Sequence, residues 1–399
     1  MTSPTAAPSS ISFPSQPPVY LDCHATTPVD PRVLEAMLPY WRERFGNAAS
    51  VNHAYGWQAA EAVEQARATL ARWLGTTPQS LIFTSGATEA NNLALKGVMR
   101  RSAPGSHLVI AAAEHRAVLD PARRLAREGY RLTVLPVDRY GAVDPQQVTE
   151  AIEPGAALVS VMLANNEVGT INPIREIGEV CRRRGVLLHC DASQGAGRMP
   201  LDLESLPVDL LSLSGHKLYA PQGIGALYIR RNDAPVRLEP LLEGGGHEQR
   251  LRSGTLPVAL IVGLGCAGEL LRTLQADESI HIATLRDRLW QGLQSRLTGL
   301  TLNGHPVNRL PGNLHVSVEG VDGEALMHAL KEIAVSSGSA CTSADPEPSH
   351  VLRAMGISEA LSKASVRFGL GRMTTDSQID FAMDYFADVV QRLRAGPKR

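Results

Sequence analysis

Residues 157–190 read ALVSVMLANNEVGTINPIREIGEVCRRRGVLLHC, and this stretch decides the fold. It contains two short apolar runs, 157–163 and 186–190, with a helical pattern at 174–184 between them. Both runs are apolar almost throughout, which is typical of strands buried on both faces of a parallel sheet. The stretch therefore predicts a strand, a crossover helix and a second, parallel strand.

The same alternation extends along the chain in both directions. Further strands are predicted at 81–84, 107–112, 132–135, 210–213 and 225–229, and further helices at 57–74, 89–101, 118–128 and 145–153. This pattern predicts an α/β doubly wound sheet over residues 30–270. After residue 275 the order changes to a helix at 279–297, strands at 313–318, 333–336 and 365–370, and helices at 322–331 and 375–394. That order predicts a second, smaller α+β domain.

The predicted helix at 57–74 is amphipathic. Its apolar side is expected to face the core and consists of Trp57, Ala60, Val63, Leu70 and Leu74.

The composition is that of a globular protein with balanced charge. The 399 residues are 44% hydrophobic, and 39 basic residues stand against 40 acidic ones. A large core can therefore form, and nothing in the charge favours nucleic acid or a membrane as a direct partner. Apolar runs long enough for a transmembrane helix are lacking. Residues 1–18 contain five Pro, five Ser and no charged side chain, so we expect a disordered tail on a cytoplasmic protein.

The five cysteines include no CxxC pair, which argues against a zinc ribbon and a disulfide scaffold. Cys23 with His24, and Cys341 with His350, lack the paired spacing of zinc ligands. We therefore expect no metal site and judge each thiol by its own surroundings.

Lys217 is the first candidate for chemistry. It ends the run Ser214-Gly215-His216-Lys217, which follows the predicted strand 210–213. The Gly- and Pro-rich segment 219–225 would wrap closely around a ligand. A surface loop lysine is the common alternative, but this setting favours a Schiff-base lysine, because a partly desolvated amine attacks carbonyl groups.

Two other segments follow strands of the same sheet, where α/β proteins bind ligands. Asp191 comes directly after the strand 186–190 and would either keep a pyridine nitrogen protonated or cap a helix. Residues 84–89, TSGATE, join a strand to a helix. They would form an anion site at the helix N-terminus or only a capped turn.

Two motifs leave alternatives open. Cys341 lies among the small polar residues of 336–343 and is either a nucleophile or an incidental surface thiol. Residues 263–268 match GxGxxG, which would suggest an NAD-dependent dehydrogenase. Because the residues that follow are helical, we expect a single helix at 257–274 in which the glycines allow close packing. A non-catalytic scaffold role is a further alternative.

The order of these motifs resembles the cysteine desulfurases of the iron–sulfur-cluster assembly type, in the class V aminotransferase group of pyridoxal-phosphate enzymes. The resemblance runs from Tyr20 to Asp388 and includes Leu21-Asp22, 25–28, 45–47, 84–89, Glu114-His115, 165–167, Asp191, Gln194, His216-Lys217, 244–246, 252–255, 337–343 and Arg367. It implies transferase fold type I, with a mostly parallel central sheet and flanking helices. A large cofactor-binding α/β domain would span 28–272, and a small α+β domain with the catalytic Cys loop would comprise 19–27 and 273–399.

The resemblance also implies roles around pyridoxal 5'-phosphate. Lys217 would form the Schiff base, and His115 would stack on the ring and serve in acid–base steps. Asp191 would pair with the ring nitrogen and Gln194 with the phenolic oxygen. The phosphate would be held by Ala87, Thr88, Ser214 and His216, together with Thr255 of the neighbouring subunit in a homodimer.

The implied substrate is L-cysteine, whose carboxylate would bind Asn166 and Arg367. Cys341 would take the sulfur as a persulfide, L-alanine would leave, and sulfur-acceptor or iron–sulfur scaffold proteins would receive the sulfur. A selenocysteine or cystine lyase of the same fold is the alternative. One departure from the family is at Cys23-His24, where Asn-Ala is common.

Overall fold

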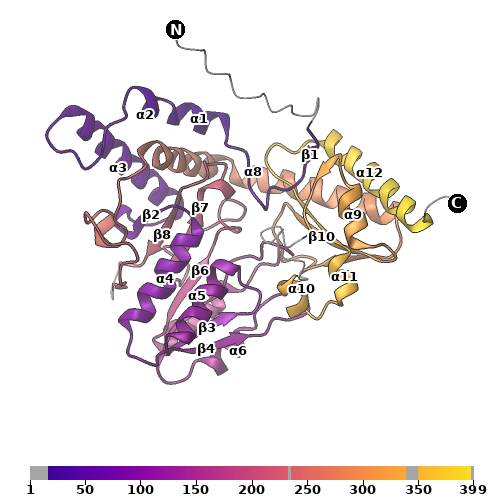
Figure 1. Ribbon diagram of the computed structural model, residues 1–399, viewed down its shortest axis with the longest axis horizontal. Helices are drawn as coiled ribbons and strands as arrows, with labels where there is room; N and C mark the ends of the chain where they lie inside the picture. The colour runs from indigo at the N-terminus through magenta and orange to yellow at the C-terminus, as the bar shows by residue number, and fades with distance from the viewer. Residues whose placement is uncertain (1–16, 232–234, 338–348, 397–399) are drawn as a thin grey trace, which may run out of the picture.

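The structure is a computed structural model that describes residues 17–231, 235–337 and 349–396. Its larger part is built on a seven-stranded sheet (Figure 1). The strands are β2 (Leu81–Thr84), β3 (His107–Ala111), β4 (Arg131–Leu135), β5 (Ala156–Ser160), β6 (Leu187–Asp191), β7 (Leu210–Ser214) and β8 (Gly225–Ile229). They lie in the order β2-β8-β7-β6-β5-β3-β4. The predicted strands all form, and the mostly parallel sheet is confirmed.

Strand β8 is the antiparallel member of this sheet. It pairs antiparallel with both β7 and β2, whereas the other pairs are parallel. A parallel connection needs a crossover, usually a helix. Residues 215–224 between β7 and β8 contain only the short 3-10 helix Gly215–Lys217, so the chain turns back directly. This turn carries Lys217.

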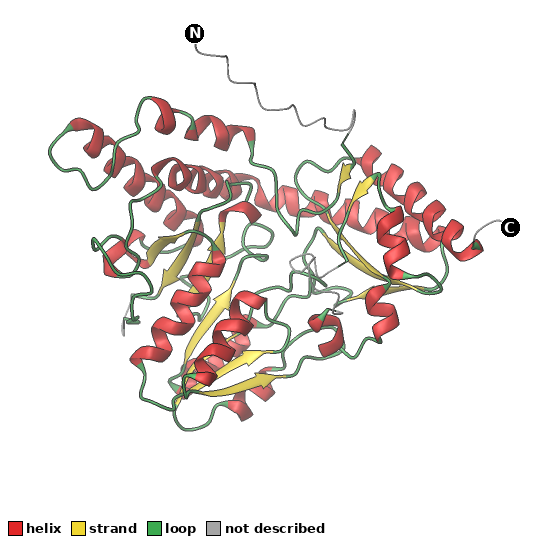
Figure 2. Cartoon of the chain, in the orientation of Figure 1, coloured by secondary structure: helices red, strands yellow, loops and turns green. Residues whose placement is uncertain are grey.

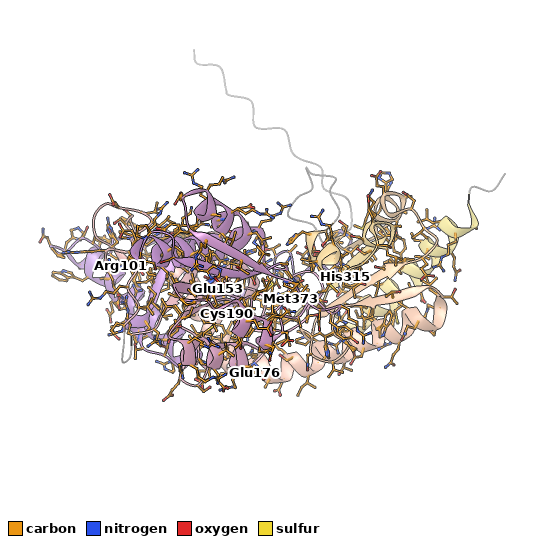
Figure 3. All side chains as sticks on the ribbon, turned by 90° about the horizontal axis from the view of Figure 1, so that it is seen from below. Arg101, Glu153, Glu176, Cys190, His315 and Met373 are labelled. Atoms are coloured by element: carbon orange, nitrogen blue, oxygen red, sulfur yellow. The ribbon has the colours of Figure 1, made fainter. Side chains whose placement is uncertain are left out.

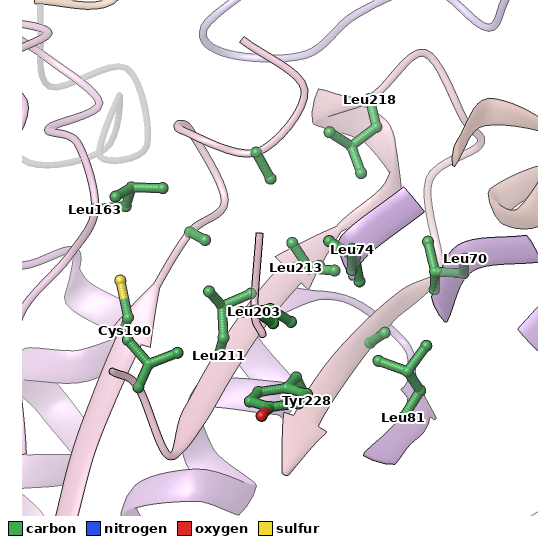
Figure 4. Close-up of a cluster of buried hydrophobic side chains, with 14 of the residues drawn as sticks. Leu70, Leu74, Leu81, Leu163, Cys190, Leu203, Leu211, Leu213, Leu218 and Tyr228 are labelled. Carbon is green, nitrogen blue, oxygen red and sulfur yellow. The ribbon is translucent and has the colours of Figure 1, made fainter. Parts of the chain in front are cut away.

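Helices cover both faces of the sheet (Figure 2). The helices of this part are α1 (Pro31–Met37), α2 (Pro39–Arg42), α3 (Ala54–Leu74), α4 (Ala87–Arg101), α5 (Arg116–Arg127), α6 (Pro145–Ala151) and α7 (Ile174–Arg184). Leu210 packs in the cluster that includes α4 and α5. Its neighbour Leu211 packs in the opposite cluster with α3 and α7, which Figure 4 shows in part. The alternation of strand side chains therefore buries both faces.

The predicted helices at 257–274 and 279–297 form one continuous helix, α8 (Val258–Arg296). The two-helix prediction was wrong because 275–278, QADE, contain no helix breaker. The glycines of the GxGxxG run lie inside α8 and pack closely. A Cβ on Gly265 would lie 2.8 Å from Ala66 Cα. The packing prediction is confirmed, and the dinucleotide alternative is wrong because the residues directly before the run, 258–262, belong to α8 and not to a strand.

Helix α8 is long and apolar enough to meet a length-and-composition test for a membrane span. Half of its most apolar stretch is buried inside the structure. Leu264 and Leu271, for example, belong to the core beneath the large sheet. Packing thus accounts for the apolar character of this helix.

The smaller part has its own hydrophobic core, formed by the second half of α8, a three-stranded sheet and α12 (Asp376–Ala395). The sheet has the order β12 (Ser365–Gly369), β10 (Asn313–Val318), β9 (Leu300–Asn303). Strand β1 (Val19–Tyr20) pairs in parallel with β11 (Ile333–Ala334), and the remaining helices are α9 (Gly323–Ala329), α10 (His350–Ala354) and α11 (Glu359–Lys363). In Figure 3, the label Cys190 lies in the larger part, on β6, and the label His315 lies in the smaller part, on β10. The domain limits themselves stay a prediction.

The first turn of α3 is more exposed than the sequence pattern predicts. Trp57 is 59% exposed, although the helical pattern placed it on the core side. Val63, Leu70 and Leu74 are buried as predicted. The indole instead donates to the carbonyl oxygen of Val51 at 2.7 Å.

Candidate active site

A cavity of about 410 Å³ opens at the carboxyl ends of β6 and β7. This is the edge at which α/β sheets bind ligands. It is lined by the predicted site residues Ala87, Thr88, His115, Asn166, Asp191, Gln194, Ser214, His216, Lys217 and Arg367. Two predicted residues are not placed there. Thr255 is exposed on the surface, and Cys341 lies outside the described residues.

Lys217 reaches into this cavity from the turn between β7 and β8. Its Nζ donates to the carbonyl oxygens of His24 and Ala25, each at 2.5 Å. Burial, and next the charge of Lys217, lower the pKa of the adjacent His216 to about 4. His216 is therefore neutral at pH 7, and its ring is a hydrogen-bonding group without charge.

Asp191 is held by Asn91 and Ser193, for which the sequence pattern predicts no role. Asn91 Nδ2 donates to Oδ2 at 2.7 Å, and the backbone N–H of Ser193 donates to Oδ1 at 2.9 Å. The Ser193 hydroxyl also donates to Oδ1. The buried carboxylate is thereby fixed in one orientation. A polar Asn91 on the otherwise apolar sheet-facing side of α4 is the signal that would have revealed its role.

The N-terminus of α4 forms an anion site. Its cap residue is Gly86, which has no side chain to accept from the first N–H groups. A Cβ on Gly225 would lie 2.7 Å from Gly86 Cα, so only glycine fits where β8 passes this turn. Glu89 in the first turn is neutralised by an ion pair with Arg252 at 2.8 Å. The N–H groups thus point at the cavity without a competing free carboxylate.

His115 caps the N-terminus of α5. Its Nδ1 accepts from the backbone N–H of Ala117 at 3.1 Å, so a neutral ring carries its proton on Nε2. The preceding Glu114 is fully buried and accepts from the backbone N–H of Met162 at 2.7 Å. Burial raises the pKa of Glu114 well above its usual value. A protonated Glu114 therefore adds no charge beside the ring.

Arg367 brings the smaller part of the chain into the cavity. It projects from β12 and is nearly fully buried. Nη1 donates to the carbonyl oxygen of Asn166, and Nη2 to Asp22 Oδ1, both at 2.8 Å. Among the described residues its Nε has no hydrogen-bond partner. A buried guanidinium with a donor to spare is suited to binding a carboxylate.

The departure at Cys23-His24 also lies at this site. Burial, the largest effect, raises the pKa of Cys23 to about 11, so its thiol stays protonated at neutral pH. His24 lines the cavity and is hydrogen-bonded to Gln194. The part of the chain that the structure describes contains no group of three His, Cys, Asp or Glu side chains placed to hold a metal ion.

The sequence and the fold of this chain are similar to those of known proteins. Residues 19–381 match the family model "Aminotransferase class-V". A cysteine desulfurase IscS of Anaeromyxobacter dehalogenans (strain 2CP-C) is 53% identical over 378 residues, which are 94% of this chain and 93% of the relative.

Two solved structures share the fold. A NifS-like protein superposes with a TM-score of 0.86 at 34% identity, over 94% of this chain and 99% of its own. SspA in complex with cysteine superposes with a TM-score of 0.80 at 36% identity, over 90% of this chain and 100% of its own. This chain therefore belongs to the class-V aminotransferase family and, within it, to the cysteine desulfurases.

Proposed function

We propose that the cavity around Lys217 removes sulfur from L-cysteine and that Cys341 receives it. The proposal rests on one observation: an amine, a buried carboxylate, a helix N-terminus and a buried guanidinium all face one cavity. The reaction is balanced without an external oxidant. L-cysteine and the Cys341 thiol give L-alanine and a Cys341 persulfide, as the C–S bond breaks and an S–S bond forms.

The residues of the cavity fit pyridoxal 5'-phosphate, the cofactor of this family. Lys217 would bind its aldehyde carbon, Asp191 its ring nitrogen, and the N-terminus of α4 with Ser214 and His216 its phosphate. The close approach of Gly225 to Gly86 holds β8 against the turn that begins α4. When bound, the cofactor supplies an electron sink for the substrate Cα.

The protein side chains then bind the substrate and move protons. Arg367 and Asn166 would bind the carboxylate of L-cysteine. The Lys217 amine would carry the Cα proton, and His115 would exchange a proton through Nε2. That SspA was solved in complex with cysteine supports an amino acid of this size in such a site.

The fate of the sulfur belongs to the same proposal. The Cys341 persulfide would pass its sulfur to acceptor proteins, including iron–sulfur scaffold proteins. A selenocysteine or cystine lyase is the alternative within the fold. A lyase would release its product without loading Cys341, so the two activities differ in the state of that thiol.

We further propose a homodimer in which Thr255 reaches the phosphate site of the second subunit. Its support is a group of exposed apolar side chains on and between α1, α2 and α3: Leu34, Leu38, Trp41, Phe45, Tyr55 and Trp57. Phe45 and Tyr55 stack with ring centroids 5.3 Å apart. Apolar surface of this kind is typical of a protein interface. A cytoplasmic location and the two-domain division are parts of the same proposal.

The experiment is turnover of L-cysteine by the purified holoenzyme with a reductant present, followed by assay of alanine and sulfide. Both products are expected from the wild-type protein, and mass spectrometry without reductant should find one extra sulfur on Cys341. Cys341→Ser should abolish both, whereas Cys266→Ser, on α8, should change neither. Full desulfuration by Cys341→Ser would refute the persulfide mechanism.

A further inference from the structure

We propose that His24 is a positioning residue that fixes the Gln194 amide with its NH₂ group toward the cofactor. The inference rests on the proposed function, in which Gln194 donates to the phenolic oxygen of the bound cofactor. The residues are 170 positions apart and meet at the cavity wall, where both are buried.

The hydrogen bonds between the two residues leave one arrangement only. The backbone carbonyl of His24 can only accept, and the Gln194 side chain lies 2.9 Å from it, so Nε2 must face this carbonyl. Gln194 Oε1 then faces His24 Nδ1, also at 2.9 Å. Because Oε1 can only accept, Nδ1 must carry the imidazole proton. The amide and the tautomer of the ring therefore fix each other.

This arrangement determines what Gln194 presents to the cavity. One N–H of Nε2 is used by the His24 carbonyl, and the second remains for a ligand. The oxygen, which would repel a phenolate, is occupied by the imidazole N–H. A rotated amide would place Oε1 against the carbonyl oxygen of His24 and lose the hydrogen bond to it, even if Nε2 then donated to Nδ1 of the other ring tautomer.

The surroundings keep His24 in this state. Its backbone is held tightly, since a Cβ on Gly369 would lie 2.8 Å from His24 N. Burial lowers the pKa of His24 well below its usual value, and the charges of Arg198, Arg367 and Lys217 lower it further. A neutral ring with its proton on Nδ1 therefore persists across the physiological pH range.

The experiment compares His24→Leu with His24→Asn in the holoenzyme. Leu has no donor, whereas Asn Nδ2 can take the place of His Nδ1 and donate to Gln194 Oε1. The readout is the pH titration of the visible absorption of the cofactor bound through Lys217. When the Lys217 nitrogen loses its proton, the negative charge on the phenolic oxygen of the cofactor is no longer compensated. A hydrogen bond donated by Gln194 stabilises that charge and so lowers the titration midpoint.

His24→Leu keeps the backbone carbonyl of residue 24 but loses the N–H that holds Gln194 Oε1, so the titration midpoint should rise by at most about 0.7 unit, the equivalent of one ordinary hydrogen bond. His24→Asn should restore it. His107→Asn is a matched control, because His107 is a buried histidine at the opposite end of the sheet, bonded to Thr133. It should leave the midpoint unchanged. In a Gln194→Leu background, His24→Leu should add no shift.

An unshifted midpoint in His24→Leu, or an additive shift in the double variant, would overturn the proposal. If His24→Leu does not fold, His24→Ala lacks the donor without adding bulk and is read in the same way. The titration needs no turnover. A holoenzyme that titrates as expected but leaves L-cysteine intact would refute the proposed function and not the role of His24.

Discussion

Arg367 on β12 donates from Nη2 to Asp22 Oδ1 over 2.8 Å, so the smaller sheet is joined to the N-terminal segment at the cavity wall. The same guanidinium holds the carbonyl of Asn166. Three segments far apart in the chain thus meet at one side chain. The position of the arginine is set before any substrate arrives.

Replacing Arg367 by Lys should mainly weaken substrate binding. Lysine keeps the charge but cannot hold Asp22 and Asn166 while also facing a carboxylate. We expect KM for L-cysteine to rise about tenfold or more, with a smaller fall in kcat. Steady-state kinetics measure both, and Arg288→Lys, in an exposed ion pair with Asp380, is the control. An unchanged KM would contradict the assigned role.

Asn91→Leu should leave the Asp191 carboxylate less firmly held in its orientation. The change removes the donor to Asp191 Oδ2 and leaves a buried acceptor without a partner. The free energy of unfolding should fall by about 1–3 kcal/mol. Cofactor affinity should fall as well, which equilibrium dialysis of the apoprotein checks. Gln65→Leu, at an exposed position of α3, should affect neither quantity.

Gly225→Ala should damage the anion site directly. The new Cβ would lie 2.4 Å from the Leu213 carbonyl oxygen and 2.7 Å from Gly86 Cα, and backbone atoms cannot yield as a side chain can. We expect weaker binding of both pyridoxal 5'-phosphate and inorganic phosphate. For Gly268→Ala the nearest atom is the side-chain Cδ1 of Leu70 at 3.3 Å, so this variant should bind like the wild type.

Glu167 should make stability depend on pH. Burial raises its pKa to about 7, above the usual value of an unfolded glutamic acid. The folded state thus holds a proton that the unfolded state releases first, and this contribution to stability is lost as pH rises through 7. Glu167→Gln should flatten that loss, which denaturant titrations follow from pH 4.5, the usual pKa of glutamic acid, to about pH 7. The control Glu150→Gln changes an exposed residue and should leave the pH dependence of the free energy of unfolding unchanged. If Glu167→Gln showed the same pH dependence as the wild type, the raised pKa of Glu167 would be contradicted.

Trp41→Glu combined with Trp57→Glu should yield a monomer. Both indoles lie in the exposed apolar group on α1 to α3, and a charge there opposes burial in an interface. Light scattering after size-exclusion chromatography gives the mass directly. Ile280→Glu, on an exposed part of α8, tests whether any surface charge has this effect. A wild-type monomer would itself exclude this interface.

The local pattern of the sequence was sufficient to place Lys217 and Asp191 at the edge of the sheet, because Asp191 ends one strand with a clear apolar run and Lys217 lies in the short turn after the next one. It could not show which residues Asn91 and His24 contact. Their partners are 100 and 170 residues away, and only the assembled sheet brings them together. Trp57 was misplaced for a related reason: helical periodicity shows which side is apolar but not whether the first turn extends beyond the core.

The continuous helix α8 has a mechanical consequence. At about 1.5 Å per residue its 39 residues make a rod nearly 60 Å long that is embedded in both hydrophobic cores. A helix without a central proline or glycine break resists bending. The crossing between the two cores therefore contains no residue type at which a sharp kink is expected. Along this route the part of the chain that carries Lys217 and the part that carries Arg367 are connected by a continuous helix and not by a hinge loop.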